Sequence, residues 1–428
     1  MPTPSPSPSG AHAAKRHMLV FDSAYTYKIM VERKVAVIVT GRDLGGYFDH
    51  IWTCHPVASL LEPEGSPERF GRPLIHELAP GHTMVEGRIG RYPGLAWFGI
   101  LNFILAQVDL MRLLLRIVRE QDVRIVRAED PHYNGFLALI VARLRKLPLM
   151  IGVWGNPGAV RKVTGVPLTA RLFRKVWVEE MVERFVLRRA DRVMAQNEDN
   201  RGFVVASGVP REKTEIFRIG NLLHEAHFAD PAARGDGQAD LAALGVAGEH
   251  TLLTVSRLQE LKLVHHVIQA VKTLKDRGRR VIALFVGEGP YRPDMEALAA
   301  ELGVTDQVLF CGNREQPWLA RVIPAVSMVV SPLTGRAMGE AALGGAPMVA
   351  YDIDWHSELV TTGETGELVP YLDHKAMADA IQRILDDPER ARRMGAALRA
   401  KAMAMLDPQA ADRAQIAAYQ SLLGQKQR

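Results

Sequence analysis

The chain carries, at residues 326–352, the sequence VSMVVSPLTGRAMGEAALGGAPMVAYD. Its valine-rich start predicts a buried strand, Pro332 and Gly335 predict a turn, and the run from Ala337 to Leu343 favours a helix. A second apolar run at 348–351 predicts another strand. The segment therefore has the strand, helix, strand order that is typical of a parallel sheet.

The start of this helix suits a phosphate group. A helix that begins near Gly335 points unpaired backbone N–H groups outward, with the positive end of the helix dipole behind them. Glu340 lies one turn after Arg336 on the same face, where its carboxylate would accept hydrogen bonds from ligand hydroxyls. Phosphate and hydroxyl groups together indicate a nucleotide. An ordinary surface ion pair between Arg336 and Glu340 is the alternative.

Short apolar runs alternate with helical patterns along both halves of the chain. This alternation predicts an α/β fold of two Rossmann-like, doubly wound parallel-sheet domains that face each other across a cleft. The expected strands are 18–21, 51–54, 123–127, 149–153 and 192–195 in the first half, and 251–255, 281–286, 308–310, 328–330 and 348–351 in the second.

The boundary between the domains is expected within residues 221–250, which are rich in Gly, Ala and Asp and lack a strand pattern. We expect a disordered Pro- and Ser-rich tail at 1–17, a first domain at 18–222 and a second domain at 223–407.

Composition excludes several classes of protein. The chain has 428 residues, of which 47% are hydrophobic and 24% charged, as in soluble globular proteins of two or more domains. Its two cysteines, Cys54 and Cys311, exclude a zinc finger and a disulfide framework and fit a reducing cytoplasm. Asp352 and Asp354 are not expected to bind a metal, because they follow a strand in a context unlike that of a metal site.

Charge is distributed unevenly between the halves. Residues 1–220 contain 31 Lys and Arg against 22 Asp and Glu, whereas residues 221–428 contain 22 against 26. An anionic membrane surface, an anionic substrate or a solvated helix face would each explain the basic first half. Nucleic acid is not an expected partner, because aromatic residues are sparse in the basic clusters and no binding motif accompanies them.

The apolar segment 94–118 is expected to form a core-facing amphipathic helix. Its uncharged part, 94–108, is shorter than the roughly 20 residues that a membrane-spanning helix needs. Contact with a membrane interface is the alternative.

Loops suited to a ligand follow four consecutive expected strands of the second half. Arg257 and Lys262, after the strand 251–255, would converge on one diphosphate. Gly287 and Gly289 follow the strand 281–286 and would let a ligand approach the backbone closely. Asn313 follows the next strand, and the helix start at residue 335 follows the one after.

In this combination the second half resembles the donor-binding domain of retaining glycosyltransferases of the GT-B fold, family 4. The resemblance is strong over about residues 250–400 and loose over the first half. The matching motifs are Ser256-Arg257-Leu258 with Lys262, Val286 to Pro290, Val308 to Gly312, Glu340 to Ala350, and Glu358 to Pro370. The resemblance also implies that the first domain binds the acceptor and the second the donor, and that a C-terminal helix, 408–428, belongs with the first domain.

The resemblance implies transfer of a hexose from a nucleotide-sugar donor, with retention and without a cofactor or metal. The acceptor would be a polysaccharide, a lipid-linked molecule or a small molecule. Arg257 and Lys262 would neutralise the leaving diphosphate. The other implied donor contacts are Gly287, Gly289, Asn313, Thr334, Glu340 on the ribose hydroxyls, and the backbone of Gly335, Arg336 and Ala337 on the distal phosphate.

The sequence departs from the family pattern on both sides. Pro332 stands where a carboxylate near the donor sugar is usual, so Thr334 or Arg336 would have to read the sugar. In the first half, Glu129 takes the place of a histidine that usually lies beside the reacting sugar, and Asp130 follows it.

These first-half residues form a charged cluster after the strand 123–127. We expect Glu129 and Asp130 to be catalytic, and Arg127 and His132 to lie on the acceptor side. A solvated loop is the alternative interpretation of the cluster.

The protein is expected in the cytoplasm. Contact of the basic first domain with the inner face of the membrane is a further hypothesis. Two other functions fit the same fold: a sugar-nucleotide epimerase, and a catalytically silent protein that binds nucleotide sugars.

Overall fold

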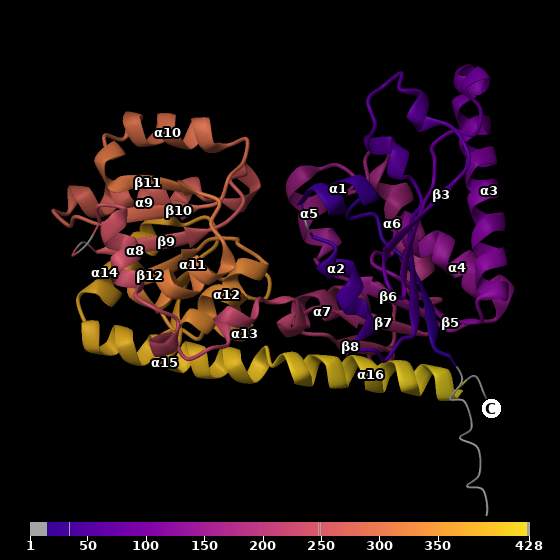
Figure 1. Cartoon of the computed structure of the whole chain (residues 1–428). Coiled ribbons are helices and arrows are strands. Elements are labelled where there is room, and N and C mark those ends of the chain that lie inside the picture. Colours follow the sequence, from indigo (N-terminus) through magenta and orange to yellow (C-terminus); the bar gives the residue numbers. More distant parts are fainter. Residues whose placement is uncertain (1–14, 34, 247, 249, 426–428) are drawn as a thin grey trace, which may run out of the picture. The chain divides into compact units, whose positions relative to one another are not determined.

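A computed structural model of the chain describes residues 15–33, 35–246, 248 and 250–425. These residues form two compact units. Unit 1 contains the chain up to Gln196, Asn200–Phe217 and the chain from Arg413 onward; unit 2 contains Asn197–Asp199 and Arg218–Asp412. Most of the expected tail, residues 1–14, lies outside the described residues, and His17 already belongs to the first strand. Each unit is a sheet with helices packed on it (Figure 1).

Unit 1 is built on an eight-stranded sheet with the order β3-β4-β2-β1-β5-β6-β7-β8. Its neighbouring strands are parallel except for β3 against β4. The strands are β1 (His17–Phe21), β2 (His50–His55), β3 (Leu74–Ala79), β4 (His82–Glu86), β5 (Val123–Ala128), β6 (Leu149–Val153), β7 (Arg192–Ala195) and β8 (Thr214–Ile216).

One core of unit 1 lies where helices α3, α4 and α6 pack on this sheet. Leu110 and Leu114 of α3, Ala138 of α4 and Val186 of α6 are buried in it with the strand residue Val126. The helices of the first half are α1 (Tyr27–Arg33), α2 (Val37–Thr40), α3 (Gly99–Glu120), α4 (Tyr133–Arg145), α5 (Pro157–Thr164), α6 (Val176–Leu187) and α7 (Glu198–Ala206), and the last helix is α16 (Pro408–Gln425).

Unit 2 is built on a six-stranded, parallel sheet with the order β11-β10-β9-β12-β13-β14. Its strands are β9 (Thr251–Val255), β10 (Ile282–Val286), β11 (Val308–Gly312), β12 (Met328–Ser331), β13 (Met348–Tyr351) and β14 (Gly366–Val369). Its helices are α8 (Gly237–Ala243), α9 (His265–Asp276), α10 (Arg292–Glu301), α11 (Gln316–Val322), α12 (Arg336–Gly344), α13 (His356–Leu359), α14 (His374–Leu385) and α15 (Pro388–Met405).

Helix α12 is bounded by glycines at both ends. Gly335, before its first residue, has φ 63°, and Gly345, after its last, has φ 81°, values that residues with a side chain rarely adopt. The helix is buried from Met338 to Gly344. At its carboxyl end, the guanidinium groups of Arg234 and Arg399 donate hydrogen bonds to the carbonyl oxygen of Leu343.

The predicted fold class is confirmed: both halves are α/β domains with doubly wound sheets. The strands expected at 149–153, 192–195, 251–255 and 348–351 have those bounds in the structure. The strands β3 and β4, which form a hairpin, and the short strands β8 and β14 were not predicted from the sequence. The helix expected at 94–118 is observed as a 3-10 turn, Pro93–Phe98, followed by α3.

The segment Pro93–Glu120 is, among the described residues, the one that length and hydropathy alone would allow to cross a membrane. One face of α3, with Asn102, Ala106, Leu110 and Leu114, is nevertheless buried in unit 1. The helix is therefore part of the domain on that face.

Gly395 allows α15 to approach the end of α12. A Cβ atom at this position would lie 2.0 Å from the carbonyl oxygen of Gly345. We predict that Gly395→Ala lowers the free energy of unfolding by about 1–3 kcal/mol because backbone atoms would have to shift. Gly202→Ala is the matched control, since Gly202 is also helical and no atom lies within 4 Å of an added Cβ. It should be neutral or stabilising by up to about 1 kcal/mol. Urea unfolding of both variants measures the difference, and equal stabilities would contradict the packing argument.

Candidate active site

The candidate donor site lies where the strand order of unit 2 reverses. From β9 the chain proceeds outward to β10 and β11 on one side, and then to β12, β13 and β14 on the other. In doubly wound sheets the carboxyl ends of the two strands at this reversal flank the ligand-binding crevice. Arg257 and Lys262 follow β9, and Gly335 and α12 follow β12. The structure thus brings the main expected donor residues to one edge of one sheet.

Arg257 and Lys262 form a cationic pair at this edge. Arg257 is exposed and Lys262 is half-buried. Burial lowers the pKa of Lys262, the charge of Arg257 lowers it further, and Asp354 opposes the shift. Two cations that repel each other in a partly desolvated place gain stability when an anion lies against both.

The start of α12 is open. No side chain caps the helix at Gly335, and an added Cβ there would meet no atom within 4 Å. The backbone N–H groups of the first turn, at Arg336 and Ala337, therefore begin a helix end that is accessible to an anion.

Glu340 is buried, whereas Arg336 is half-exposed, with its Nε atom 3.7 Å from the Glu340 carboxylate. Burial raises the pKa of Glu340, and the charge of Arg336 and a hydrogen bond with Gln316 oppose the shift. The pair is therefore not the ordinary surface ion pair of the alternative interpretation. Thr334 is also buried, and its hydroxyl is hydrogen-bonded to that of Ser331.

Gly287 and Gly289 have a packing role within unit 2. A Cβ on Gly287 would lie 1.9 Å from the carbonyl oxygen of Ser256, and one on Gly289 would lie 2.1 Å from that of Leu258. The glycines therefore let the loop after β10 pack on the loop that carries Arg257. Their contact with a donor stays a prediction, as does that of Asn313, which is exposed after β11.

In unit 1 the strand order reverses between β1 and β5. Arg127 near the end of β5 is buried; its Nη1 atom donates to the Tyr419 hydroxyl at 2.8 Å, and its Nη2 atom donates to Glu129 at 3.2 Å. Glu129 also accepts from the indole N–H of Trp154 at 2.6 Å and lies 3.4 Å from Arg42. Arg127 and Glu129 are thus engaged with each other and with the core of unit 1.

Asp130 is the expected first-half residue with the most open surroundings. Its carboxylate is partly exposed and accepts hydrogen bonds from the backbone N–H of His132 and the side chain of Asn134. Two cavities of about 270 and 320 Å³ both have Asp130, Leu168 and Thr169 in their walls. Glu129 and His132 line the smaller cavity only.

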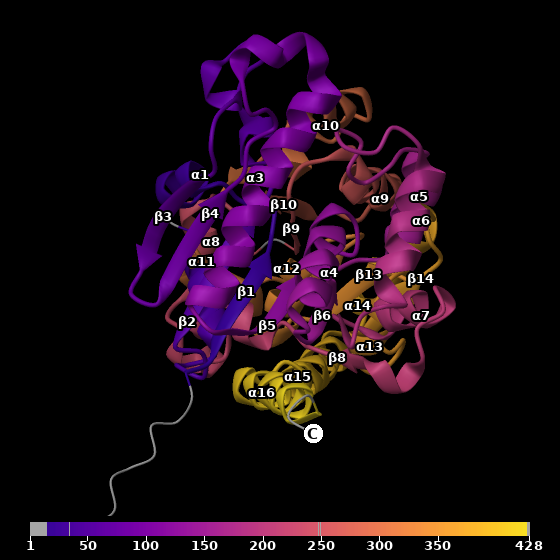
Figure 2. The ribbon, with the colours of Figure 1, turned by 90° about the vertical axis from the view of Figure 1, so that its right-hand side faces the viewer.

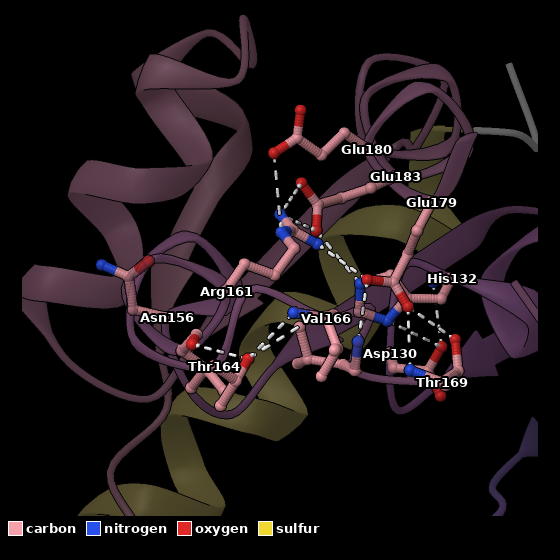
Figure 3. A network of polar contacts seen from close by, with 12 residues as sticks. Asp130, His132, Asn156, Arg161, Thr164, Val166, Thr169, Glu179, Glu180 and Glu183 are labelled. Atoms are coloured by element: carbon pink, nitrogen blue, oxygen red, sulfur yellow. Dashed lines mark hydrogen bonds and ion pairs between the residues drawn. The ribbon is translucent and has the colours of Figure 1, made fainter. Parts of the chain in front are cut away.

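Some of the residues that line these cavities, among them Asp130 and His132, belong to a charge network (Figure 3). Arg161 of α5 is 3.2 Å from Glu179 and 3.0 Å from Glu183, both on α6. His132 joins the network through its Nε2 atom, which lies 3.0 Å from the carboxylate of Glu183. Burial opposes a charge on His132, but contacts with Asp130 and Glu183 raise its pKa to about 9. Two cations therefore balance two carboxylates in the interior.

The network holds one wall of both cavities. The carboxylate of Glu179 accepts hydrogen bonds from the backbone N–H groups of Leu168 and Thr169, at 3.0 and 2.9 Å, and from the Thr169 hydroxyl at 2.6 Å. Glu183 is hydrogen-bonded to the His132 ring, and the backbone N–H of His132 donates to the Asp130 carboxylate. The same contacts therefore connect this wall to Asp130.

The roles of Arg161, Glu179 and Glu183 were not predicted from the sequence. A signal was present in α6: two glutamates four residues apart lie on the same face as Val186 and Leu187, which are buried. Carboxylates on the apolar face of a helix indicate a buried partner. Among the described residues, no His, Cys, Asp and Glu side chains are grouped so that three could hold a metal ion.

Models of known protein families match both halves of the chain. Residues 240–401 match the family model of glycosyl transferases group 1, and residues 35–220 match that of a glycosyl transferase 4-like domain. The α-D-kanosaminyltransferase of Streptomyces kanamyceticus is 28% identical over 67% of this chain and 74% of its own length. The D-inositol 3-phosphate glycosyltransferase of Nocardia farcinica is 34% identical over 50% of this chain and 49% of its own length.

A solved structure shows the same fold. Anabaena HepE in complex with UDP superposes with a TM-score of 0.70 at 19% identity, over 95% of this chain and 99% of its own. This structural likeness, the two family matches and the reversal of strand order in both sheets define the protein as a GT-B glycosyltransferase. The chain belongs to the group 1 glycosyltransferases.

We predict that Arg161→Met lowers the free energy of unfolding by about 3–5 kcal/mol, because Glu179 and Glu183 would be left as buried, uncompensated charges. Glu180→Ala is the control, because Glu180 is 37% exposed and lies 3.6 Å from the same guanidinium. A change within about 1 kcal/mol is expected for it. Urea unfolding compares the two variants; equal losses would show that the buried pairs contribute no more than the exposed one.

Proposed function

We propose that the protein transfers a hexose from a nucleotide-sugar donor, bound by unit 2, to a hydroxyl group of an acceptor bound by unit 1. The reaction proceeds with retention of anomeric configuration and without a metal ion. The observation that carries the proposal is the cationic pair Arg257 and Lys262 at the strand-order reversal that also holds the open start of α12. The UDP bound by HepE supports a uridine nucleotide as the first donor to test.

The donor side of the proposal is electrostatic. Negative charge builds up on the leaving diphosphate as its bond to the sugar breaks, and fixed positive groups lower the energy of that state more than that of the bound donor. Arg257 and Lys262 supply two cations, and the N–H groups of Arg336 and Ala337 supply a helix end. The carboxylate of Glu340 accepts hydrogen bonds from the ribose hydroxyls.

On the acceptor side, Asp130 binds the acceptor hydroxyl, because its carboxylate is partly exposed in the wall of both cavities. Glu129 is fully engaged with Arg127 and Trp154, so its part in the proposal is to fix the end of β5. The acceptor oxygen forms the new bond to the sugar, and its proton passes to an oxygen of the departing phosphate. Such a step needs no separate protein base.

The acceptor is proposed to be a polysaccharide, a lipid-linked molecule or a small hydroxylated molecule. The cavities support a bound molecule with both polar and apolar parts, since leucines and a carboxylate share their walls.

The cytoplasm is the proposed location of the protein. Both cysteines are buried and free, which fits a reducing compartment.

The proposal is tested by incubating the purified full chain with UDP-, GDP- and ADP-sugars and measuring nucleotide release, with and without EDTA. We predict release from one donor class, unchanged by EDTA, and NMR of the product should show the anomeric configuration of the donor. Loss of activity with EDTA that added Mg²⁺ or Mn²⁺ restores would refute metal independence. Interconversion of the sugar without an acceptor would establish an epimerase, and donor binding without any turnover would establish a silent binding protein.

We predict that Arg257→Ala and Lys262→Ala each weaken nucleoside diphosphate binding by about 1.5–3 kcal/mol, because each removes a charged hydrogen bond. Calorimetric titration with the active donor's diphosphate measures the loss. Arg392→Ala is the control: Arg392 is exposed on α15 and forms an ion pair with Glu389. If Arg257→Ala and Lys262→Ala bind as tightly as this control, the diphosphate site lies elsewhere.

A further inference from the structure

The outer face of α3 is apolar and exposed over its first half. Trp97, in the turn that precedes the helix, is 96% exposed, and Ile100 is 81% exposed. Phe98, Leu101 and Ile104 are exposed as well. Solvent-facing helix surfaces are normally polar, and a contiguous apolar surface of this kind marks a contact site.

This end of α3 extends past the sheet. A helix of 22 residues is about 33 Å long, whereas a strand of six residues spans about 20 Å. The helix ends at Glu120, three residues before β5 begins at Val123, so its carboxyl-terminal end lies at the amino edge of the sheet. Its amino-terminal end therefore lies beyond the carboxyl edge, and Figure 2 shows it above β1, β2 and β5.

The apolar row on α3 continues into arginines. Residues four apart in an α-helix are turned by about 40° from each other, so a series of five spreads over about 160°, which is one side of the helix. Starting at residue 100, this series reads Ile100, Ile104, Val108, Arg112 and Arg116, all of them exposed. The first arginine follows the last apolar side chain by about 6 Å along the helix. The face is thus apolar at the overhanging end and cationic further along.

The same order occurs on α6, in the same helix layer. α4 contacts both α3 and α6, and all three pack on one face of the sheet. On α6 the series of every fourth residue reads Trp177, Met181 and Phe185, and Arg189 follows two residues after the helix ends at Leu187; all four are exposed. Trp177 is 65% exposed, and the guanidinium of Arg189 lies 3.8 Å from the centre of the Phe185 ring.

We propose that the outer face of the α3–α4–α6 layer docks on an anionic lipid bilayer, with the apolar rows of α3 and α6 in the interfacial region and their arginines at the lipid phosphates. A bilayer interface accommodates this arrangement, because its acyl chains take up tryptophan, phenylalanine and isoleucine, and its phosphates bind the arginine one helical turn further on. A protein partner would not require this order twice. The excess of basic residues in the first half of the chain adds long-range attraction to an anionic leaflet.

The proposal differs from simple adsorption of a basic domain in its response to salt. Electrostatic attraction at the surface is screened by salt, whereas burial of apolar side chains is not. Binding is therefore expected to weaken at high salt without vanishing. The docking face is independent of the donor site, so it does not depend on the proposed reaction.

The test is flotation of the purified full chain with vesicles of phosphatidylcholine alone or mixed with phosphatidylglycerol, at low and at high salt. The key variant combines Trp97→Ser, Ile100→Thr and Ile104→Thr. The control is Ile75→Thr, which removes an exposed isoleucine from β3, outside the helix layer. We expect the wild type and the control to float with the anionic vesicles at both salt concentrations, and the triple variant to bind at least about tenfold more weakly.

Each result decides the proposal. Flotation of the triple variant equal to that of the wild type, or no flotation of the wild type with anionic vesicles, would overturn it. A dimer of the wild type that becomes a monomer in the triple variant, without any vesicle binding, would assign the face to a second copy of the chain. Nucleotide release assayed without vesicles separates a failed docking proposal from a failed catalytic one, since the variants leave Arg257 and Asp130 intact.

Discussion

Parallel pairing of the strands is the constraint on which both candidate sites depend. Parallel neighbours share one direction, so all their carboxyl ends lie at the same edge of the sheet. Both faces of such a sheet must be covered by helices, which is why strands such as β6 and β10 are buried along their whole length. The loops at one edge are then the part of each unit that is free to vary in sequence, and the residues with chemical roles gather there.

The two edges use their charges in opposite ways. In unit 1, the buried carboxylates of Glu179 and Glu183 are paired with Arg161 and His132, so that this network holds a wall in place. In unit 2, Arg257 and Lys262 repel each other. A cationic pair of this kind costs stability in the free protein and gains it when an anion binds. The donor side is thus prepared for a strongly charged ligand, whereas the acceptor side offers Asp130 to a hydroxyl group.

The sequence was sufficient for the parts of the fold that local pattern determines. Buried parallel strands are short continuous apolar runs, so 149–153 and 251–255 could be predicted to the residue. The hairpin β3 and β4 was missed because its first strand, Leu74–Ala79, is only partly buried and lacks a clear alternation. The start of α12 was placed correctly because Gly335 is the one residue of its turn that accepts a positive φ without cost.

Contacts between loops could not be predicted in the same way. The pattern around Gly287 and Gly289 shows only that a side chain is excluded; that the excluding group is the backbone of Ser256 and Leu258 depends on how two loops pack. The network of Arg161 was missed for the same reason, since Arg161 lies on α5, its glutamate partners lie on α6, and His132 precedes α4. Site residues themselves were easier to find than the residues that hold them, because a ligand-binding loop follows its strand directly in sequence.

The direction of the helices links the docking face to the acceptor side. In a parallel sheet each covering helix runs opposite to the strands, so its amino-terminal end lies at the edge where the strands end. For α3 and α6 this places the apolar rows at the edge of unit 1 that also carries Asp130, while their arginines lie toward the other edge. A bilayer that held the apolar ends would lie beside the cavities whose walls include Asp130 and Leu168. Of the three proposed acceptor classes, a lipid-linked molecule is the one whose reactive hydroxyl such a surface would deliver to that edge.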